Sequence, residues 1–229
     1  MSLIDDFISL FFPKTCPACG YNLFNNEKVI CTKCLYHLPK TNFHHEKDNP
    51  VSKVFWGRVN LESAMAMYYY RKGGKVQHLI HQLKYKGYQE IGIFLGELLG
   101  SELKATEGFK TIDLIIPIPL HRKKLQKRGF NQSEVFAKGL SNSMHVEVDT
   151  KSVIRTVATS TQTKKSRYKR WENVNEIFEL KNPDKLAGKH VLVADDVITT
   201  GATMEACIQV IQQSPGVKVS VVSIGFASH

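Results

Sequence analysis

Three stretches of the chain are predominantly apolar over the length of a β-strand. They are TIDLIIPIPL at 111–120, VLVAD at 191–195 and VKVSVVSIGFA at 217–227. Apolar runs without regular polar alternation are typical of strands buried on both faces of a parallel sheet. GATMEACIQVIQQ at 201–213 has helical periodicity and lies between the last two runs, which predicts a βαβ unit. The pattern therefore predicts an α/β fold built on a parallel sheet.

Two more helices are expected upstream of these runs. IGIFLGELLGSEL at 91–103 has apolar residues at helical spacing, and so does the stretch 73–87 before it. The apolar face of 73–87 consists of Val76, Leu79, Ile80 and Leu83. The aromatic-rich stretch 61–70 indicates a strand or a packed segment.

The first thirteen residues, MSLIDDFISLFFP, combine an apolar helical face with two early acids. No basic segment precedes the apolar residues, so this stretch is not a signal peptide. It predicts a short amphipathic helix that packs on the domain and ends at Pro13. Binding to a membrane surface is a minor alternative, because anionic lipid repels Asp5 and Asp6. The chain has no charge-free apolar run long enough to span a bilayer, so we expect a cytoplasmic protein without stable membrane insertion.

Four of the five cysteines form two C-x2-C pairs with eleven residues between them. Such pairs curl the backbone around a metal, and Gly20 permits the tight turn after the first pair. Two disulfides and an iron–sulfur site are the alternatives. A reducing cytosol disfavours disulfides, and ligand type and spacing favour a structural zinc with no open coordination position. The predicted zinc ligands are Cys16, Cys19, Cys31 and Cys34.

These features divide the chain into three parts. Residues 1–40 hold the N-terminal helix and the zinc module, and the polar stretch 41–53 is expected to be a linker. The α/β domain is expected to occupy 54–229. Within it, Cys207 lies on the apolar face of 201–213 and is expected to be a buried core thiol.

The excess of positive charge is confined to two short runs. The chain has 31 Lys and Arg against 21 Asp and Glu, a formal net charge of +10. The runs 122–128 and 164–170 contain five cations each, and removing these ten from the 31 leaves 21 of each sign. A solvated charged face is the alternative, but such runs favour a phosphorylated small molecule or a nucleic-acid backbone as ligand. The candidate DNA contacts are Lys123, Lys124, Lys127, Lys164, Lys165, Arg167, Lys169 and Arg170.

VADDVITTGATM at 193–204 places two acids and a Thr-Gly loop between an expected strand and an expected helix. Parallel sheets bind ligands at the carboxyl ends of their strands, and loop amides at a helix N-terminus can converge on a phosphate. Asp195 and Asp196 cannot bind that phosphate and need a neutral polyol or a cation. A phosphorylated ribose satisfies both needs, with magnesium bridging its oxygens. The loop residues are Thr199, Thr200, Gly201, Ala202 and Thr203.

This stretch resembles the PRPP-binding motif of type I phosphoribosyltransferases. The wider chain is similar to the ComF family of competence proteins, in the four-cysteine module, in IPIPLHRKKLQKRGFNQSEVFA at 116–137, and in Arg155-Thr156 followed by Thr161-Gln162 and Arg167. The resemblance implies that 54–229 is a phosphoribosyltransferase-like domain that binds PRPP with magnesium. It also implies a role in DNA uptake during natural transformation, at the inner face of the membrane. There the protein would handle single-stranded DNA beside a competence helicase and the membrane DNA channel.

In phosphoribosyltransferases, the place of IPIPLHRK is taken by the pyrophosphate loop. The resemblance implies that backbone amides near 119–122 and a guanidinium in this stretch neutralise a diphosphate. For Asn131 and Gln132, capping of the following helix is an equal alternative to ligand contact. The candidates are Leu120, His121, Arg122, Arg128, Asn131 and Gln132.

Three functions remain open from the sequence. The first is a DNA-uptake protein that binds PRPP and single-stranded DNA, which the basic runs favour. The second is an active phosphoribosyltransferase with an unknown acceptor, which would displace pyrophosphate from C1 of PRPP. Thr199 stands where many base-salvaging phosphoribosyltransferases carry an aspartate that assists the incoming nitrogen, which argues against general-base catalysis at this position. Some members of the superfamily manage with threonine, so an active enzyme stays open. The third is a PRPP-sensing regulator.

Overall fold

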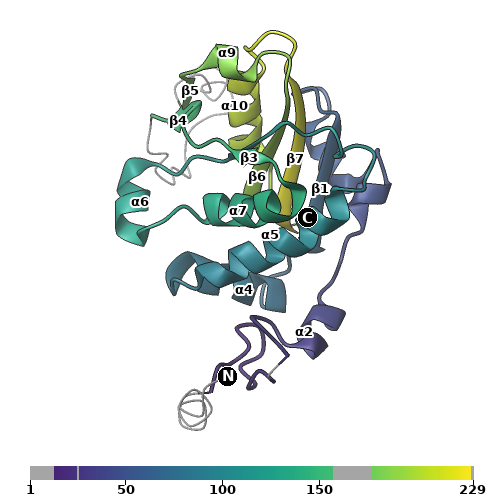
Figure 1. The fold of residues 1–229 in the computed structure, drawn as a ribbon, viewed down its shortest axis with the longest axis vertical. Helices are drawn as coiled ribbons and strands as arrows, with labels where there is room; N and C mark the ends of the chain where they lie inside the picture. The colour runs from purple at the N-terminus through teal and green to yellow at the C-terminus, as the bar shows by residue number, and fades with distance from the viewer. Residues whose placement is uncertain (1–12, 25, 157–176, 228–229) are drawn as a thin grey trace.

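The computed structural model describes residues 13–24, 26–156 and 177–227. Its centre is a five-stranded parallel sheet in the order β1-β7-β6-β2-β3 (Figure 1), as the apolar runs predict. A second, antiparallel sheet pairs β4 with β5. The strands are β1 (Ser63–Tyr69), β2 (Leu114–Pro117), β3 (Glu147–Val148), β4 (Val153–Arg155), β5 (Phe178–Leu180), β6 (His190–Ile198) and β7 (Lys218–Phe226).

Helices cover both faces of the sheet. α5 and α7 pack on one face and α10 on the other (Figure 1). The direction of the chain explains this, because β2 leads through α7 outward to β3, whereas β6 leads through α10 to β7 in the opposite direction. Right-handed crossovers that run in opposite directions lie on opposite faces. The helices are α2 (Thr32–His37), the 3-10 helix η1 (Phe43–His45), α3 (Pro50–Phe55), α4 (Lys75–Tyr85), α5 (Gln89–Leu103), α6 (Arg122–Arg128), α7 (Gln132–Met144), α9 (Pro183–Leu186) and α10 (Ala202–Ile211).

α5 and α7 approach each other closely through glycines. A Cβ on Gly96 would lie 2.4 Å from the carbonyl oxygen of Phe136, and a Cβ on Gly139 would lie 2.1 Å from that of Ile93. Both distances are too short for any side chain, so glycine is required at these crossing points. The contact fixes the position of α7, whose N-terminus borders the site described below.

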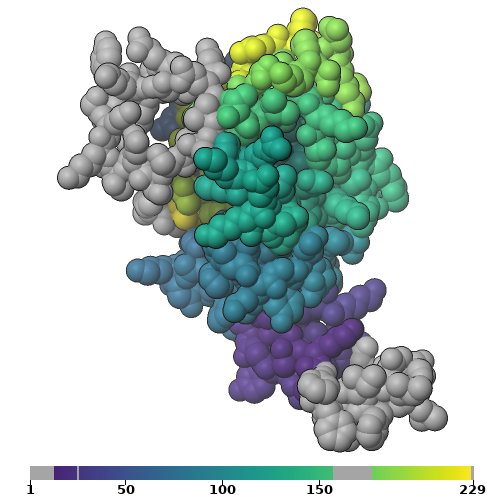
Figure 2. Space-filling model, turned by 90° about the vertical axis from the view of Figure 1, so that its left-hand side faces the viewer, coloured from purple at the N-terminus to yellow at the C-terminus, as the bar shows by residue number. Residues whose placement is uncertain are grey.

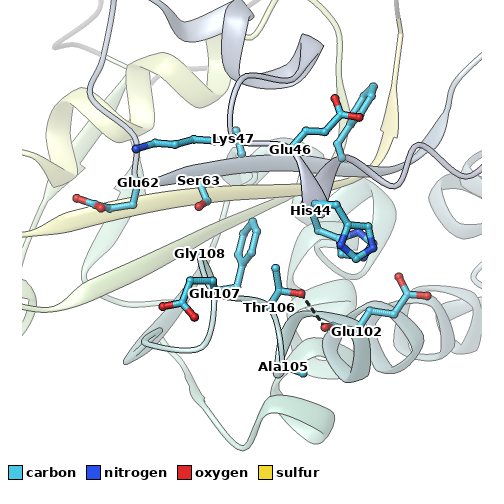
Figure 3. Close-up of a pocket in the computed structure, with 14 residues that line it drawn as sticks. His44, Glu46, Lys47, Glu62, Ser63, Glu102, Ala105, Thr106, Glu107 and Gly108 are labelled. Atoms are coloured by element: carbon cyan, nitrogen blue, oxygen red, sulfur yellow. Dashed lines mark hydrogen bonds between the residues drawn. The ribbon is translucent and has the colours of Figure 1, made fainter.

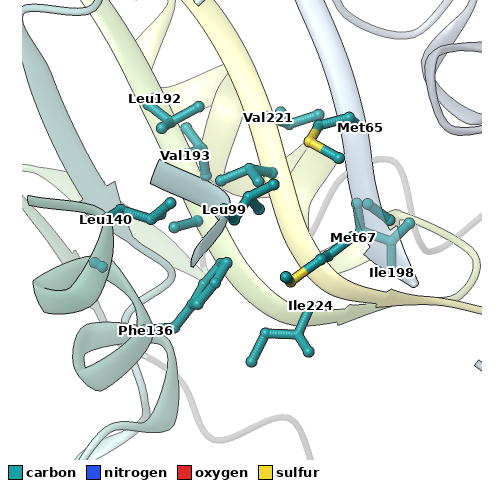
Figure 4. Close-up of a cluster of buried hydrophobic side chains, with 14 of the residues drawn as sticks. Met65, Met67, Leu99, Phe136, Leu140, Leu192, Val193, Ile198, Val221 and Ile224 are labelled. Atoms are coloured by element: carbon teal, nitrogen blue, oxygen red, sulfur yellow. The ribbon is translucent and has the colours of Figure 1, made fainter. Parts of the chain in front are cut away.

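The core runs through the central strands. Figure 4 shows Val193 of β6 and Val221 of β7 beside Leu99 of α5 and Phe136 of α7, and all four side chains are fully buried. On the other face, Cys207 of α10 is also fully buried, which confirms it as a core thiol. Burial on both faces explains why the central strands show no polar alternation.

The segment that joins the cysteine module to the sheet lies along β1. Thr41 N donates to Met67 O at 3.1 Å. Asn49 is 1% exposed and donates from Nδ2 to Ala64 O at 2.7 Å. The stretch 41–53, which its polar composition assigns to a linker, therefore connects the two parts while packing against the edge strand.

The cysteine module projects from one end of the molecule, beyond the blue α4 and α5 (Figure 2). Residues 15–20 face α4, where they line a cavity of about 360 Å³ together with His78, Gln82 and Tyr88. α4 thus lies between the module and the sheet.

One strand is longer than its apolar run. β6 continues through Asp195 and Asp196 to Ile198, whereas the apolar run ends at Asp195 and the sequence pattern expects the strand to end at the two acids. The reason is pairing with β7, which places Asp195 opposite Ser223 and Ile198 opposite Phe226. The acids are consequently held by a regular strand rather than by a loop.

Some expectations concern residues outside the described ranges. These are the amphipathic helix expected before Pro13 and the basic run with Lys164, Lys165, Arg167, Lys169 and Arg170. Thr161 and Gln162 lie outside the described ranges as well. Within those ranges, none of the helices combines the length and apolar character needed to cross a bilayer.

Candidate functional site

β2 and β6 are adjacent strands whose following helices diverge. β2 is followed by α6 and α7 on the way to β3, and β6 is followed by α10 on the way to β7. In open parallel sheets, ligands bind in the crevice outside the carboxyl ends of two such strands. The segments after Pro117 and after Ile198 border this position.

The loop after β6 has the features of an anion-binding turn. Gly201 has a φ of 74° and is the N-cap of α10. In the described part of the chain, the backbone N–H groups of Thr199, Thr200 and Gly201 donate to no other protein group. The first turn of a helix leaves its N–H groups free as well, here including those of Ala202 and Thr203. These donors and the helix dipole favour a bound anion.

The end of α3 supports this loop from outside. A Cβ on Gly201 would lie 2.6 Å from Val54 Cγ1, so both the φ angle and the packing require glycine. Arg58 Nη1 donates to Thr200 O at 3.4 Å and to Glu205 Oε2 at 3.3 Å. The loop is therefore held in place without using its own free N–H groups.

Asp195 and Asp196, here called the acid pair, lie just before the loop. Asp196 is 4% exposed and forms an ion pair with Lys84 of α4. Asp195 is partly buried, and its Oδ1 accepts from Ser133 Oγ at 2.7 Å and from the Asp196 N–H at 2.8 Å. Burial, together with the charge of Asp196, raises the pKa of Asp195 to about 7. The strand end thus holds two closely spaced carboxyls, compensated by one lysine and by hydrogen bonds.

Asn131 fixes the segment after β2. Its Oδ1 accepts from Ser133 N at 3.1 Å and caps α7, while its Nδ2 donates to Ile118 O at 3.0 Å. The capping interpretation of Asn131 is therefore confirmed. By capping α7, Asn131 also positions Ser133, which donates to the acid pair.

The basic helix α6 follows the same segment and has no buried residue. His121 is its N-cap and accepts from Lys123 N at 3.2 Å. At the other end, Arg128 donates to Gln132 Oε1, and its guanidinium carbon lies 5.4 Å from the ring centroid of Tyr85 at the end of α4. The remaining predicted residues of this segment, Leu120, Arg122, Lys124 and Lys127, precede or lie on α6.

Several residues of the site were missed by sequence reasoning. Lys84, Ser133 and Arg58 contact the acid pair or the loop from distant parts of the chain. Ser133 precedes Asp195 by 62 positions and Arg58 precedes Thr200 by 142, so no local pattern links them. Arg155 of β4 lies in the same electrostatic environment: burial lowers its pKa, and the charge of Asp195 opposes that shift.

Comparisons with known proteins agree with this geometry. The family described as Phosphoribosyl transferase domain matches residues 131–226, which include α7, the acid pair and the loop. "DNA utilization protein YhgH" of Shigella flexneri is 32% identical over 210 residues, which cover 90% of this chain and 87% of that protein. "Competence protein F" of Haemophilus influenzae is 31% identical over 130 residues, covering 55% of this chain and 57% of that protein.

The chain belongs to the ComF family. Among solved structures, glutamine phosphoribosylpyrophosphate amidotransferase from B. subtilis is similar with a TM-score of 0.40 and 15% identity, over 58% of this chain and 26% of that chain.

The four predicted cysteines of this ComF protein form one cluster. Their sulfur atoms all lie within 4.8 Å of one another, and Cys16, Cys31 and Cys34 are buried. No disulfide joins these four cysteines, and the mutual approach of all four sulfurs fits one shared metal ion better than two separate S–S bonds. Backbone N–H groups donate to two of the sulfurs, Cys31 N to Cys16 Sγ and Cys34 N to Cys31 Sγ, each at 3.4 Å.

The cluster is compatible with a structural zinc. A tetrahedral ion with Zn–S bonds of about 2.3 Å separates its sulfur ligands by about 3.8 Å. The Cys19 and Cys31 sulfurs are 3.7 Å apart. Gly20 adopts a φ of 77°, as expected for the turn after the first pair. Four thiolates would fill the coordination sphere, so the residues present suit a folding element rather than a catalytic metal.

A larger hollow of the ComF fold lies away from this site. A cavity of about 760 Å³ opens at the amino end of β1, between residues 43–47 and 105–109 (Figure 3). Glu62, Ser63 and Ala64 also line it. Because the acid pair lies at the carboxyl ends of the parallel strands, this cavity is not part of the candidate site.

We predict one tightly bound zinc per chain. Cys31→Ser should remove the metal and make the module sensitive to proteolysis, because the thiolates hold two knuckles that have little other core. Cys207→Ala, which alters a thiol outside the cluster, should retain the zinc. The measurement is elemental analysis with limited proteolysis, and iron in place of zinc, or no metal in anaerobically purified protein, would refute the prediction.

Asp195→Asn should stabilise the fold at neutral pH. The pKa of this carboxyl is higher in the folded protein than the value of about 4 in the unfolded chain. Below about pH 4 the group is protonated in both states and costs no stability. As the pH rises from about 4 through the folded-state pKa, ionisation increasingly favours the unfolded chain. Asn keeps an oxygen for the Ser133 hydroxyl and removes the charge. We expect the free energy of unfolding at pH 8 to rise by about 1–3 kcal/mol, with the gain shrinking toward pH 4.

Urea denaturation across this pH range checks the prediction. Asp184→Asn, at an exposed position on α9, is the matched control and should show no such trend. A gain that is independent of pH would contradict the assignment of the cost to the buried charge.

Proposed function

We propose that this ComF protein binds PRPP at the carboxyl ends of β2 and β6 and handles single-stranded DNA during DNA uptake. The observation that carries the proposal of PRPP binding is that the acid pair at the end of β6 is followed directly by a loop with free N–H groups. The names of the relatives, DNA utilization protein and competence protein, support the proposed role in handling DNA.

The loop suits the 5′-phosphate of the ligand. Five successive N–H groups at 199–203, together with the hydroxyls of Thr199, Thr200 and Thr203, supply donors within one short loop. Because α3 and Arg58 hold the loop from outside, little ordering is needed when the anion binds. A preformed donor set of this kind favours a phosphate over a neutral group.

The acid pair suits the ribose. Carboxylates accept hydrogen bonds from the 2′- and 3′-hydroxyls, and charge-assisted bonds of this kind are among the stronger hydrogen bonds in proteins. The strand keeps the two acids in fixed positions relative to the loop, which starts only three residues after Asp196. The distance between phosphate and hydroxyls is thus set by regular backbone rather than by a mobile segment.

The diphosphate would lie on the side of β2 and α6. Arg128 and Arg122, at the two ends of α6, supply guanidinium groups there. Magnesium bound with PRPP supplies the additional positive charge that a departing diphosphate requires. The residues of the chain itself bind and orient the ligand.

An active phosphoribosyltransferase is the second candidate, because the acid pair and the loop are also what a displacement at C1 requires. Thr199 is exposed and carries no carboxylate, so it cannot take a proton from the acceptor. Any acceptor would therefore have to attack C1 without a protein base at position 199 to remove its proton.

The DNA role rests on α6. Its five cations lie on a helix without buried residues beside the proposed ligand site, and a basic surface of this kind binds a phosphate backbone without reading its sequence. We further propose a cytoplasmic protein that acts at the inner face of the membrane, with a competence helicase and the membrane DNA channel as partners.

The double variant Asp195→Asn, Asp196→Asn should weaken binding of PRPP with magnesium about 30-fold or more, since two charge-assisted hydrogen bonds lose their charge. Calorimetry of wild type and variant measures this loss, with Asp184→Asn as a control that should bind normally. Equal affinities would mean that the motif is only a structural scaffold.

The triple variant Lys123→Ala, Lys124→Ala, Lys127→Ala should weaken binding of single-stranded DNA. Each lost phosphate contact lowers the slope of log affinity against log salt by about 0.7, so the slope should fall by about 2. Anisotropy of a labelled oligonucleotide across a salt series gives this slope.

Lys104→Ala, Lys110→Ala, Lys218→Ala is the matched control, because it removes the same charge from exposed positions away from α6. Its slope should equal that of the wild type. If the wild type fails to bind DNA at low salt, direct contact is excluded and the role in DNA uptake must act through a protein partner.

A further inference from the structure

Lys84 neutralises one of the two acids that the proposed ligand needs. It lies in the last turn of α4, and its side chain is 23% exposed while that of its partner Asp196 is 6% exposed. A carboxylate this deeply buried needs a counter-charge, and in the free protein Lys84 provides it.

Ligand binding changes the interactions that the Asp196 carboxylate has to make. To accept a ribose hydroxyl, the carboxylate has to give up part of its contact with the lysine ammonium. The incoming diphosphate carries more negative charge than a single carboxylate and offers several acceptor oxygens. A lysine head group on a flexible four-carbon stem can move between such partners, which a rigid guanidinium fork does less easily.

Three arginines near the site have partners that the ligand does not need. Arg128 donates to Gln132, and Arg58 donates to Glu205 and to the loop backbone. Arg155 is held over the ring of Phe178, with 5.3 Å between its guanidinium carbon and the ring centroid. Lys84 differs from these arginines because its present partner is itself a member of the acid pair.

The end of α4 also places Lys84 next to the basic helix. Tyr85, the following residue, lies under the guanidinium of Arg128. One helix end therefore contacts both the acid pair on β6 and the last residue of α6. An ammonium that leaves Asp196 remains on the side where the diphosphate is expected.

We propose that Lys84 is a diphosphate-binding residue. It forms an ion pair with Asp196 in the free protein and moves to the diphosphate when PRPP binds. The transfer frees Asp196 for a ribose hydroxyl. It also makes the site selective, because a sugar phosphate without a diphosphate offers the displaced ammonium no new partner. This inference rests on the proposed PRPP site.

The test compares two ligands and three variants by calorimetry with magnesium present. The ligands are PRPP and ribose 5-phosphate, which lacks the diphosphate, and the variants are Lys84→Met, Lys84→Arg and Lys86→Met. Lys84→Met should weaken PRPP about tenfold or more while changing ribose 5-phosphate by less than about threefold, since the loss of a competitor for Asp196 offsets the loss of its counter-charge. Lys84→Arg should have a PRPP affinity between those of the wild type and Lys84→Met, because the guanidinium keeps the charge but moves between partners less easily. Lys86→Met, which removes an exposed charge two residues away, should bind both ligands normally.

Each other outcome overturns the inference in a distinct way. An equal loss of both ligands would show that Lys84 only supports the acid pair, and an unchanged PRPP affinity would show that the ammonium stays on Asp196. If Lys84→Met does not fold, Lys84→Gln is measured against the same criteria. A wild type that binds no PRPP would overturn the proposed function as well, whereas a defect confined to the Lys84 comparison leaves that function intact.

Discussion

The acid pair constrains how the rest of the site is built. β6 pairs with β7 through Ile198, so a central strand holds the backbone of Asp195 and Asp196 in place. Charge in such a position has to be compensated by groups from other elements. α4 supplies Lys84 and α7 supplies Ser133, and the position of α7 depends in turn on its glycine contact with α5. Helix packing that looks purely structural thus sets the geometry of the acids.

The fold also explains why a phosphate loop and an acid pair meet at one place. β2 and β6 are neighbours whose crossovers run in opposite directions, which leaves the ends of both strands uncovered. α3 closes the outer side of the loop at Gly201, and α6 extends the open side with positive charge. In the described part of the chain, the cysteine cluster lies beyond α4, the helix that carries Lys84 (Figures 1 and 2).

Much of this could be predicted from the sequence, because strands buried on both faces and C-x2-C pairs leave strong local patterns. The parallel sheet, the helix from Ala202 and the four-cysteine cluster are confirmed. The extent of β6 could not be predicted, since Asp195 and Asp196 are poor strand formers that remain in the strand only through pairing with β7. The role of Lys84 could not be predicted either. In the sequence it is an ordinary polar position beside Leu83, and its importance comes from the ion pair with Asp196 on a distant strand. Asn49 similarly belongs to a polar stretch that composition cannot distinguish from a solvated linker, yet it is buried against β1.

The central claim is that a phosphoribosyl ligand binds on the loop that follows the acid pair. Backbone amide chemical shifts test it most directly, because they report the binding position residue by residue without requiring catalysis. On titration with PRPP and magnesium, the largest shifts should occur at Thr199, Thr200, Gly201, Ala202 and Thr203, with smaller ones at Ser133. Shifts confined to the cavity between 43–47 and 105–109, or no saturable shifts at the loop, would contradict the claim.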